Sequence, residues 1–260
     1  MFGEVFLKDN VENIFKVFGI CDKIFNPVLT VNDLGISYRT INSWETSGLM
    51  LRERSNSRNW HKFSFVDFVW LNIVYELRQL GFPLSKIKML KDFLNENIDE
   101  KALFEVKRRE ALISLNSVTL DRLVMLLAEI LHNKNHIALL CNKEGGVYIY
   151  NEQLIKEDRS AVDLGQLAFN NFVSISFTDI IIKYLNNTRI DVIEETGIVD
   201  YRFLEILIAL REGTIQGLIF QLPEEKNIQI EPALFNKYHD FRNACLRLML
   251  TVRFDSIVVI

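Results

Sequence analysis

The sequence predicts an α+β fold that is mostly helical, and three observations support this class. Only four prolines and eleven glycines interrupt the 260 residues, which favours long helices. Residues 100–133 carry apolar side chains at helical spacing without any glycine or proline. Beyond His136 the period changes, and short apolar runs alternate with helical segments, as in mixtures of strands and helices. We therefore expect a helical first half followed by an α+β domain.

The pattern divides the chain into four segments. An accessory helix is expected at 1–26, and Asn26-Pro27 is a plausible boundary after it. A compact helical domain follows, and then a long helix and the α+β domain. The expected bounds of these three segments are 27–95, 96–135 and 136–260.

Composition limits the class of protein. Apolar residues make up 49% of the chain and charged residues 25%, the level of a globular protein with a buried core. The first residues lack the pattern of a secretory signal, and no apolar run approaches the ~20 residues that span a membrane. The three cysteines, which lie far apart, indicate reduced thiols that fill the core: Cys21, Cys141 and Cys245. These features predict a cytoplasmic protein without a membrane partner.

The charge is unevenly distributed. The whole chain carries a formal net charge of −4. Between Ile36 and Phe63, however, five basic side chains face only Glu45 and Glu53, so this segment is positive and the remainder is acidic. The basic residues are Arg39, Arg52, Arg54, Arg58 and Lys62. A basic segment on an acidic body is compatible with a local DNA-binding surface.

Residues 30–48 predict two helices joined by a tight turn. A short helix precedes Gly35, and Ser37 is a typical N-cap for the helix that follows. This second helix is expected over 38–47 and to end at Gly48. A helix, a glycine turn and a second helix form the geometry that offers the second helix to the major groove of DNA.

The next residues predict a wing and two further helices. Two short strands with a loop at 53–59 fit the segment 49–63. Ser64 and Asp67 form a capping box, which opens a helix that carries apolar residues at helical spacing. Ser85 is expected to cap the next helix.

The long helix carries a heptad seam. Its members alternate three and four residues apart, and one of them is polar, as expected of a residue that sets the register. The seam residues are Ile113, Asn116, Leu120, Leu123, Leu127 and Ile130. This stripe predicts an interface between two copies of the chain. Because Leu112, Leu115 and Leu126 widen the apolar face, packing against the C-terminal domain of the same chain is the alternative.

The C-terminal segment predicts both strands and helices. Apolar runs at 137–140 and 147–150 flank Glu144-Gly145-Gly146, which indicates a hairpin. Asp200 is expected to cap a helix that ends at Gly213. The other expected elements are strands at 172–177, 214–222, 227–231 and 256–260, and helices at 178–184 and 232–252.

Taken together, the motifs from Thr30 to Leu94 resemble the DNA-binding domain of the mercury-resistance-regulator (MerR) family. They are Gly35-Ile36-Ser37-Tyr38-Arg39-Thr40-Ile41, Trp44-Glu45, Gly48-Leu49, Trp60-His61-Lys62-Phe63-Ser64 with Asp67, and Leu77-Arg78-Gln79-Leu80-Gly81-Phe82-Pro83-Leu84. Order and spacing agree throughout. The resemblance implies a winged helix-turn-helix domain followed by an antiparallel dimerisation helix.

The resemblance places DNA contacts at the start of the second helix and on the wing, where side chains reach base edges and phosphates respectively. The contacts expected from the helix are Ser37, Tyr38, Arg39, Thr40 and Asn42. Those expected from the wing are Arg52, Arg54, Arg58, Trp60, His61 and Lys62, with packing beneath the wing as the favoured role of Trp60.

Three positions depart from the family pattern. Ser43-Trp44 stands where an aromatic pair is usual, and Asn42 and His61 stand where the family usually has arginine. These departures weaken the expected grip on phosphates, which Arg58 and Lys62 can compensate.

The sequence predicts neither a metal centre nor a cofactor. His132 and His136 lie four residues apart at the end of the long helix, but two ligands are too few for a structural zinc site. Gly145-Gly146 lacks the Lys-Ser/Thr that follows a phosphate loop. No catalytic triad or closely spaced carboxylate motif is visible, so we do not expect an enzyme.

These inferences lead to a functional hypothesis. We expect a homodimeric transcription factor that binds double-stranded DNA at a pseudo-palindromic operator, with an effector or protein sensed by the C-terminal domain. RNA polymerase is a candidate partner, because family activators distort an over-long promoter spacer. The alternative is an architectural or recombination-accessory DNA-binding protein. A third hypothesis, an enzyme fused to a DNA-binding domain, lacks a recombinase motif after residue 136.

Overall fold

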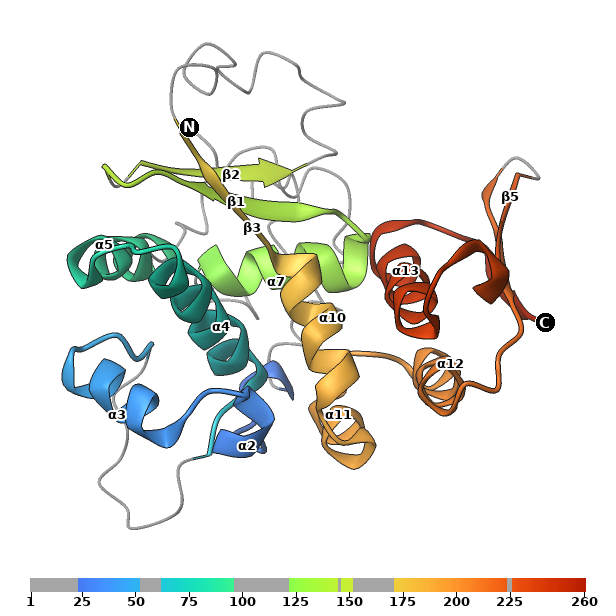
Figure 1. Ribbon diagram of the computed structural model, residues 1–260, viewed down its shortest axis with the longest axis horizontal. Coiled ribbons are helices and arrows are strands. Elements are labelled where there is room, and N and C mark those ends of the chain that lie inside the picture. The colour runs from blue at the N-terminus through green and yellow to red at the C-terminus, as the bar shows by residue number, and fades with distance from the viewer. Residues whose placement is uncertain (1–22, 52–61, 96–121, 145, 152–170, 224–225) are drawn as a thin grey trace, which may run out of the picture.

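A computed structural model describes residues 23–51, 62–95, 122–144, 146–151, 171–223 and 226–260. Helices dominate the first half, and two small antiparallel sheets lie in the second half (Figure 1). This mixture agrees with the predicted α+β class. The helices described before residue 96 are α2 (Val31–Leu34), α3 (Tyr38–Thr46), α4 (Phe65–Gln79) and α5 (Leu84–Asn95).

The first sheet has the strand order β2-β1-β3, and both pairs are antiparallel. Its strands are β1 (Ile137–Cys141), β2 (Val147–Asn151) and β3 (Val173–Ser176), which confirms the predicted hairpin and the strand after it. Leu139 of the central strand lies opposite Ile149 and Ile175. Helix α10 (Phe177–Asn187) begins directly where β3 ends, and Ser176 caps it by accepting a hydrogen bond from Asp179 N.

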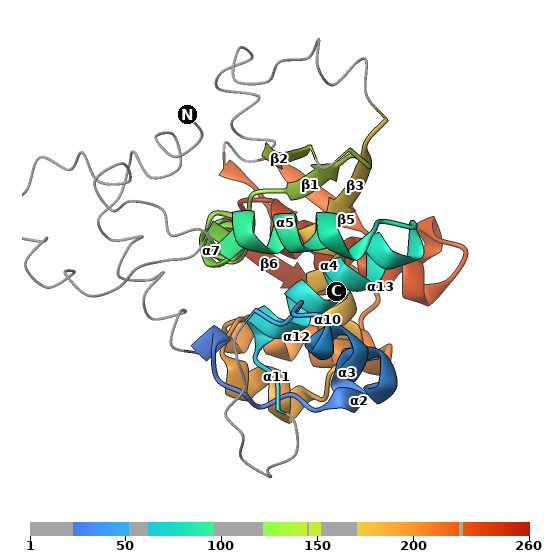
Figure 2. The ribbon, with the colours of Figure 1, turned by 90° about the vertical axis from the view of Figure 1, so that its left-hand side faces the viewer.

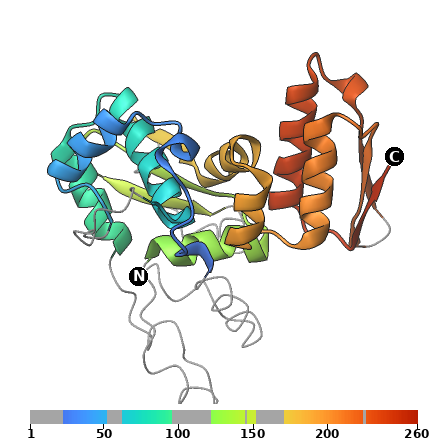
Figure 3. The same ribbon diagram turned by 90° about the horizontal axis from the view of Figure 1, so that it is seen from below.

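The second sheet has the order β5-β4-β6, again antiparallel. In Figure 3 two neighbouring helices, drawn in orange and red, stand against one face of this sheet. They are α12 (Tyr201–Glu212) and α13 (Tyr238–Thr251), and the strands are β4 (Leu218–Gln221), β5 (Asn227–Ile230) and β6 (Ser256–Val259).

One predicted helix is divided in two. The sequence indicated a single helix at 232–252, but the structure has a short 3₁₀ turn, η4 (Pro232–Leu234), before α13. Phe235 and Lys237 adopt extended backbone conformations between them, so the helix begins only at Tyr238.

The hydrophobic core is continuous across the expected segment boundaries. Its buried side chains run from Ile24 to Ile257. The two halves meet where α10 packs against α4. There the ring of Tyr184 contacts Phe65 and Phe68 edge-on, with centroid distances of 4.9 and 5.0 Å. Figure 2 shows α10 beside the helices of the first half.

Helix α7 (Arg122–Asn133) is the described part of the predicted long helix, and it lies inside the molecule. It contacts α5, α10 and α13, and every residue from Leu123 to Leu131 is buried. The seam residues Leu123, Leu127 and Ile130 are 1%, 0% and 0% exposed. They therefore leave no surface for a second chain, which fits the alternative of packing within one chain. The other seam residues, Ile113, Asn116 and Leu120, lie outside the described residues.

The expected histidine pair on the end of this helix does not form. Lys134 adopts a left-handed conformation with φ 57°, and α7 ends at Asn133. His136 therefore leads into β1, where its Nδ1 lies 3.2 Å from Thr178 Oγ1. His132 and His136 do not share a helical turn.

Within the described ranges, none of the helices combines the length and the apolar character that a membrane span requires.

Candidate nucleic-acid interface

The turn between α2 and α3 is fixed by local hydrogen bonds. Asp33 Oδ2 accepts from the backbone N and from the hydroxyl of Thr30, each at 2.7 Å, which holds the start of α2. Gly35 then takes φ 64°, a left-handed conformation that costs glycine least. Ser37 Oγ accepts from Thr40 N at 3.2 Å and so caps α3. The predicted helix, glycine turn and capped helix are therefore confirmed.

Two buried residues set which side of α3 faces solvent. Ile41 and Trp44 are 0% and 6% exposed and hold the inner face of the helix on the core. At the start of the helix Ser37, Tyr38 and Arg39 are all exposed, and Tyr38 is 51% exposed although it is large and partly apolar. Thr40 and Asn42, which follow them, are half-buried. The five residues expected to contact DNA thus lie together around the start of α3, and Arg39 is the one that points away from Ile41 and Trp44.

The segment after α3 is held by hydrogen bonds from side chains of α4 and α5. Trp70, fully buried on α4, donates its Nε1–H to Leu49 O at 2.6 Å. Lys91 on α5 donates to Gly48 O at 2.8 Å and to Met50 O at 3.3 Å. These bonds satisfy carbonyls at the end of α3 and fix the direction in which the chain leaves the helix.

Most of the predicted wing lies outside the described residues. Arg52, Arg54, Arg58, Trp60 and His61 fall in this range, so their expected roles stay predictions. Lys62 is described and exposed. The next residue, Phe63, forms an antiparallel bridge with Leu29, with N–O distances of 2.9 and 2.8 Å. The chain that follows the predicted wing is therefore hydrogen-bonded, through Phe63, to the residues just before α2.

A further basic residue, absent from the predicted set, lies beside this surface. Lys88 on α5 is exposed, and its Cε and Nζ come within 3.8 Å of the position that a Cβ on Gly48 would take. Its ammonium group thus sits next to the end of α3. The signal in the sequence was the alternation of Lys88 and Lys91 with the core positions Ile87 and Leu90.

A second helix, glycine turn and helix occurs in the C-terminal half. Helix α11 (Ile190–Thr196) ends at Gly197 with φ 56°, and Asp200 Oδ1 accepts from Phe203 N at 2.7 Å to cap α12. The unit exposes a largely acidic surface, formed by Asp191, Glu194, Glu195, Glu205 and Glu212. Acidic side chains repel phosphates, so the α2–α3 unit is the better candidate for binding DNA.

Two described cysteines are buried structural residues. Burial raises the pKa of the Cys141 and Cys245 thiols to about 12, far from the range of a reactive thiolate. Within the described ranges, no three His, Cys, Asp or Glu side chains are grouped so that they could hold a metal ion.

Comparison with known proteins agrees with this geometry. Residues 30–94 match the family model described as MerR HTH family regulatory protein. Searches of curated proteins and of solved structures find no match to the chain. The matched range begins just before α2 and ends within α5, so it contains α3 with its exposed face and the buried residues that support it. Over residues 30–94, then, the chain carries a helix-turn-helix domain of the MerR regulatory type, which supports a DNA-binding transcriptional regulator.

Proposed function

We propose that the protein is a homodimeric transcriptional regulator that reads a pseudo-palindromic operator by placing α3 in the major groove. The observation that carries this proposal is the exposed start of α3, where Ser37, Tyr38 and Arg39 face solvent while Ile41 and Trp44 hold the helix on the core. In helix-turn-helix proteins the residues at the start of the second helix contact base edges.

The charge of the surroundings supports the same orientation. Lys62 and Lys88 are exposed near the two ends of the segment that carries the predicted wing. Lysines placed beside a recognition helix contact phosphates, which fixes the register of the protein on the duplex. The acidic α11–α12 unit would instead stay away from the DNA backbone.

The test is a binding titration with DNA duplexes tiled across the region around the gene. We expect one site with inverted symmetry to bind far more tightly than the others, with an affinity that falls steeply as salt rises. Arg39→Ala should weaken binding to that site by ~1–3 kcal/mol if the guanidinium reads a base.

Arg247→Ala is the matched control, because Arg247 is an exposed arginine on α13, at the other end of the molecule in Figure 1. It should leave the affinity unchanged. If no duplex binds above the non-specific level, the regulator proposal fails. A specific site far from any promoter spacer would favour the architectural alternative.

The homodimer is the second part of the proposal. One helix-turn-helix unit neutralises few phosphates, whereas two units related by a two-fold axis double the contacts and read both half-sites. Because Leu123, Leu127 and Ile130 are buried in their own chain, we assign the pairing to the earlier part of the seam. The mass in solution should be that of a dimer for the wild type and of a folded monomer for Ile113→Glu with Leu120→Glu. A monomeric wild type that still binds its operator tightly would contradict the dimer.

A further inference from the structure

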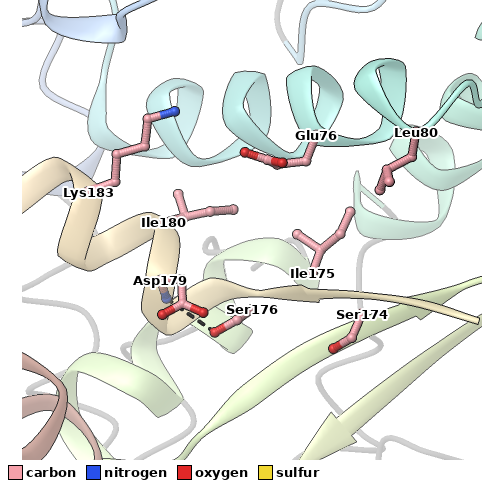
Figure 4. A pocket seen from close by; sticks show the side chains of 8 residues that line it. All are labelled: Glu76, Leu80, Ser174, Ile175, Ser176, Asp179, Ile180 and Lys183. Atoms are coloured by element: carbon pink, nitrogen blue, oxygen red, sulfur yellow. Dashed lines mark hydrogen bonds between the residues drawn. The ribbon is translucent and has the colours of Figure 1, made fainter. Parts of the chain in front are cut away.

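A cleft opens between the helix-turn-helix domain and the C-terminal half (Figure 4). Its volume is about 320 Å³, and α4 forms one wall while β3 and α10 form the other. Cavities of this size hold small ligands, and such sites occur preferentially where domains meet. The position matters because a molecule in this cleft would touch both halves of the chain at once.

The cleft has an apolar base. Ile175 of β3 and Ile180 of α10 are 4% and 5% exposed, and Figure 4 shows both side chains directed toward α4. Leu80, at the end of α4, reaches into the cleft from the other side and remains 43% exposed. A ligand with an apolar body would cover this exposed leucine and rest on the two isoleucines.

Each wall of the cleft carries one acidic side chain. Glu76 projects from α4 and Asp179 from α10, and both are exposed. Arg247 binds one oxygen of Asp179, while Glu76 has no ion pair within the described part of the chain. The basic side chain that lines the cleft, Lys183, is already engaged on α4. Its Nζ donates to Asn72 Oδ1 at 2.7 Å and lies 5.4 Å from the centre of the Tyr75 ring.

We propose that this cleft binds a small organic cation, an ammonium group on a compact apolar body. The ammonium group would lie between Glu76 and Asp179, and the apolar body would cover Leu80, Ile175 and Ile180. A bare divalent metal fits less well, because within the described residues no third acidic, His or Cys side chain joins the two carboxylates. An anion is disfavoured because Lys183, the one ammonium among the described residues that line the cleft, is turned toward Asn72 and Tyr75.

The contact between α4 and α10 around Tyr184, which we call the joint, indicates how a ligand in the cleft could affect the helix-turn-helix domain. Around Tyr184 the two helices are held by buried aromatic contacts, whereas at Glu76 and Leu80 they are separated by the cleft. A cation that binds both walls would draw α10 toward α4 at the open end of the cleft. Helix α4 in turn supports the segment that follows α3, through the hydrogen bond from Trp70 to Leu49 O. The binding itself does not depend on DNA and can be measured without it.

The test is calorimetric titration of the full chain with 2-phenylethylamine, with 2-phenylethanol as the neutral molecule of the same shape. We expect the amine to bind with one-to-one stoichiometry, and the alcohol to bind at least about tenfold more weakly because it lacks the charge. Glu76→Gln should weaken binding of the amine by about tenfold and Asp179→Asn by a similar factor. Leu80→Trp should abolish binding by filling the cleft while leaving both carboxylates in place.

Glu194→Gln is the control, because Glu194 is an exposed glutamate on α11 outside the cleft. Its affinity for the amine should equal that of the wild type. Thermal unfolding curves verify that each variant is folded before its affinity is compared. The proposal is overturned if the amine fails to bind at millimolar concentration, if the alcohol binds equally well, or if neither charge-removing variant weakens the amine.

Discussion

At the scale of single residues, the candidate DNA surface depends on groups that hold α3 in its position and orientation. Ile41 and Trp44 fix the rotation of α3 about its axis, and Ser37 fixes where the helix begins. Trp70 and Lys91 then hold the carbonyls at which the chain leaves the helix. Exposed side chains such as Arg39 can be substituted without loss of the fold, which makes their contribution to binding measurable.

Lys88 offers a test that separates phosphate contact from base reading. Its ammonium group lies beside Gly48 at the end of α3, away from the start of the helix where base edges are read. We expect Lys88→Ala to weaken binding to every duplex by a similar factor and to reduce the slope of log affinity against log salt by about 1. The measurement is a salt series with a specific and a non-specific duplex.

Lys237→Ala serves as the control for this experiment, since Lys237 is exposed at the start of α13. It should leave the salt slope unchanged. A loss confined to the specific duplex would mean that Lys88 reads a base, and an unaltered slope would remove it from the interface.

Glu129 makes a prediction about pH. Its carboxylate is buried at the end of α7, where it accepts hydrogen bonds from Asn133 Nδ2 at 2.8 Å and Asn135 Nδ2 at 2.7 Å. Burial raises its pKa above the ordinary value of 4.5, although these two bonds and nearby Arg253 oppose the shift. The folded state therefore holds the proton more strongly than the unfolded state.

The sign of the pH effect follows from this difference. The contribution of Glu129 to stability is fully present below about 4.5 and is lost as the pH rises through the raised pKa of the folded state. We expect Glu129→Gln to remove this dependence, with a slope difference of at most about 1.4 kcal/mol per pH unit. Urea unfolding of both proteins from pH 4 to 8 measures it. A difference in stability that stays constant over that range would show that Glu129 does not titrate in this way.

At the scale of elements, the apolar seam of helix α7 indicates that the helix is buried but not whether its own chain or a second chain buries it. We expect Leu123→Ala to lower the free energy of unfolding by about 2–5 kcal/mol, because the side chain is fully enclosed by its own chain. The loss should not vary with protein concentration, since no second chain contributes to this packing. Unfolding curves at concentrations differing a hundredfold test this. If the loss shrinks at high concentration, the residue belongs to a dimer interface.

Much of the secondary structure could be predicted because its signals are local. Gly35, Ser37, Asp200 and Gly213 mark the ends of helices through their own backbone preferences and caps, and the structure places helix ends there. The hairpin of β1 and β2 follows from two apolar runs and a glycine turn. Such features need no knowledge of the rest of the chain.

What the sequence could not predict depends on contacts between distant residues. An apolar stripe indicates that α7 is buried, but both a partner chain and α5, α10 and α13 satisfy that pattern equally. The pairing of β4 with β6 joins strands that are separated in the sequence by β5, η4 and α13, and no local signal specifies it. Lys88 was missed for the same reason, since only the packing of α5 brings it next to Gly48.

At the scale of the whole molecule, the two halves behave as one packed body. The core is continuous, and Tyr184 of α10 stands between them with its ring 0% exposed against Phe65 and Phe68 of α4. Its hydroxyl lies 3.2 Å from Thr196 Oγ1, which satisfies the polar atom inside the core. Aromatic pairs of this geometry add about 0.5–1.5 kcal/mol each beyond the area they bury. A helix-turn-helix domain attached through such a joint is expected to unfold together with the C-terminal half.

The chain provides a convenient measurement of that coupling, because all three tryptophans, Trp44, Trp60 and Trp70, lie in the first half. Tryptophan fluorescence therefore follows the helix-turn-helix half, while far-ultraviolet circular dichroism follows the entire chain. For the wild type we expect the two urea transitions to coincide, as they must for a single cooperative unit.

Tyr184→Ala should lower the free energy of unfolding by about 3–5 kcal/mol and separate the two transitions, because it removes the ring that fills the joint between α4 and α10. Tyr184→Phe retains the ring and loses only the hydroxyl bond to Thr196, so it should cost about 0.5–1.5 kcal/mol and keep the transitions together. Two transitions already separated in the wild type would show that the joint does not couple the halves, and a Tyr184→Ala variant with coincident transitions would show that contacts elsewhere in the core suffice.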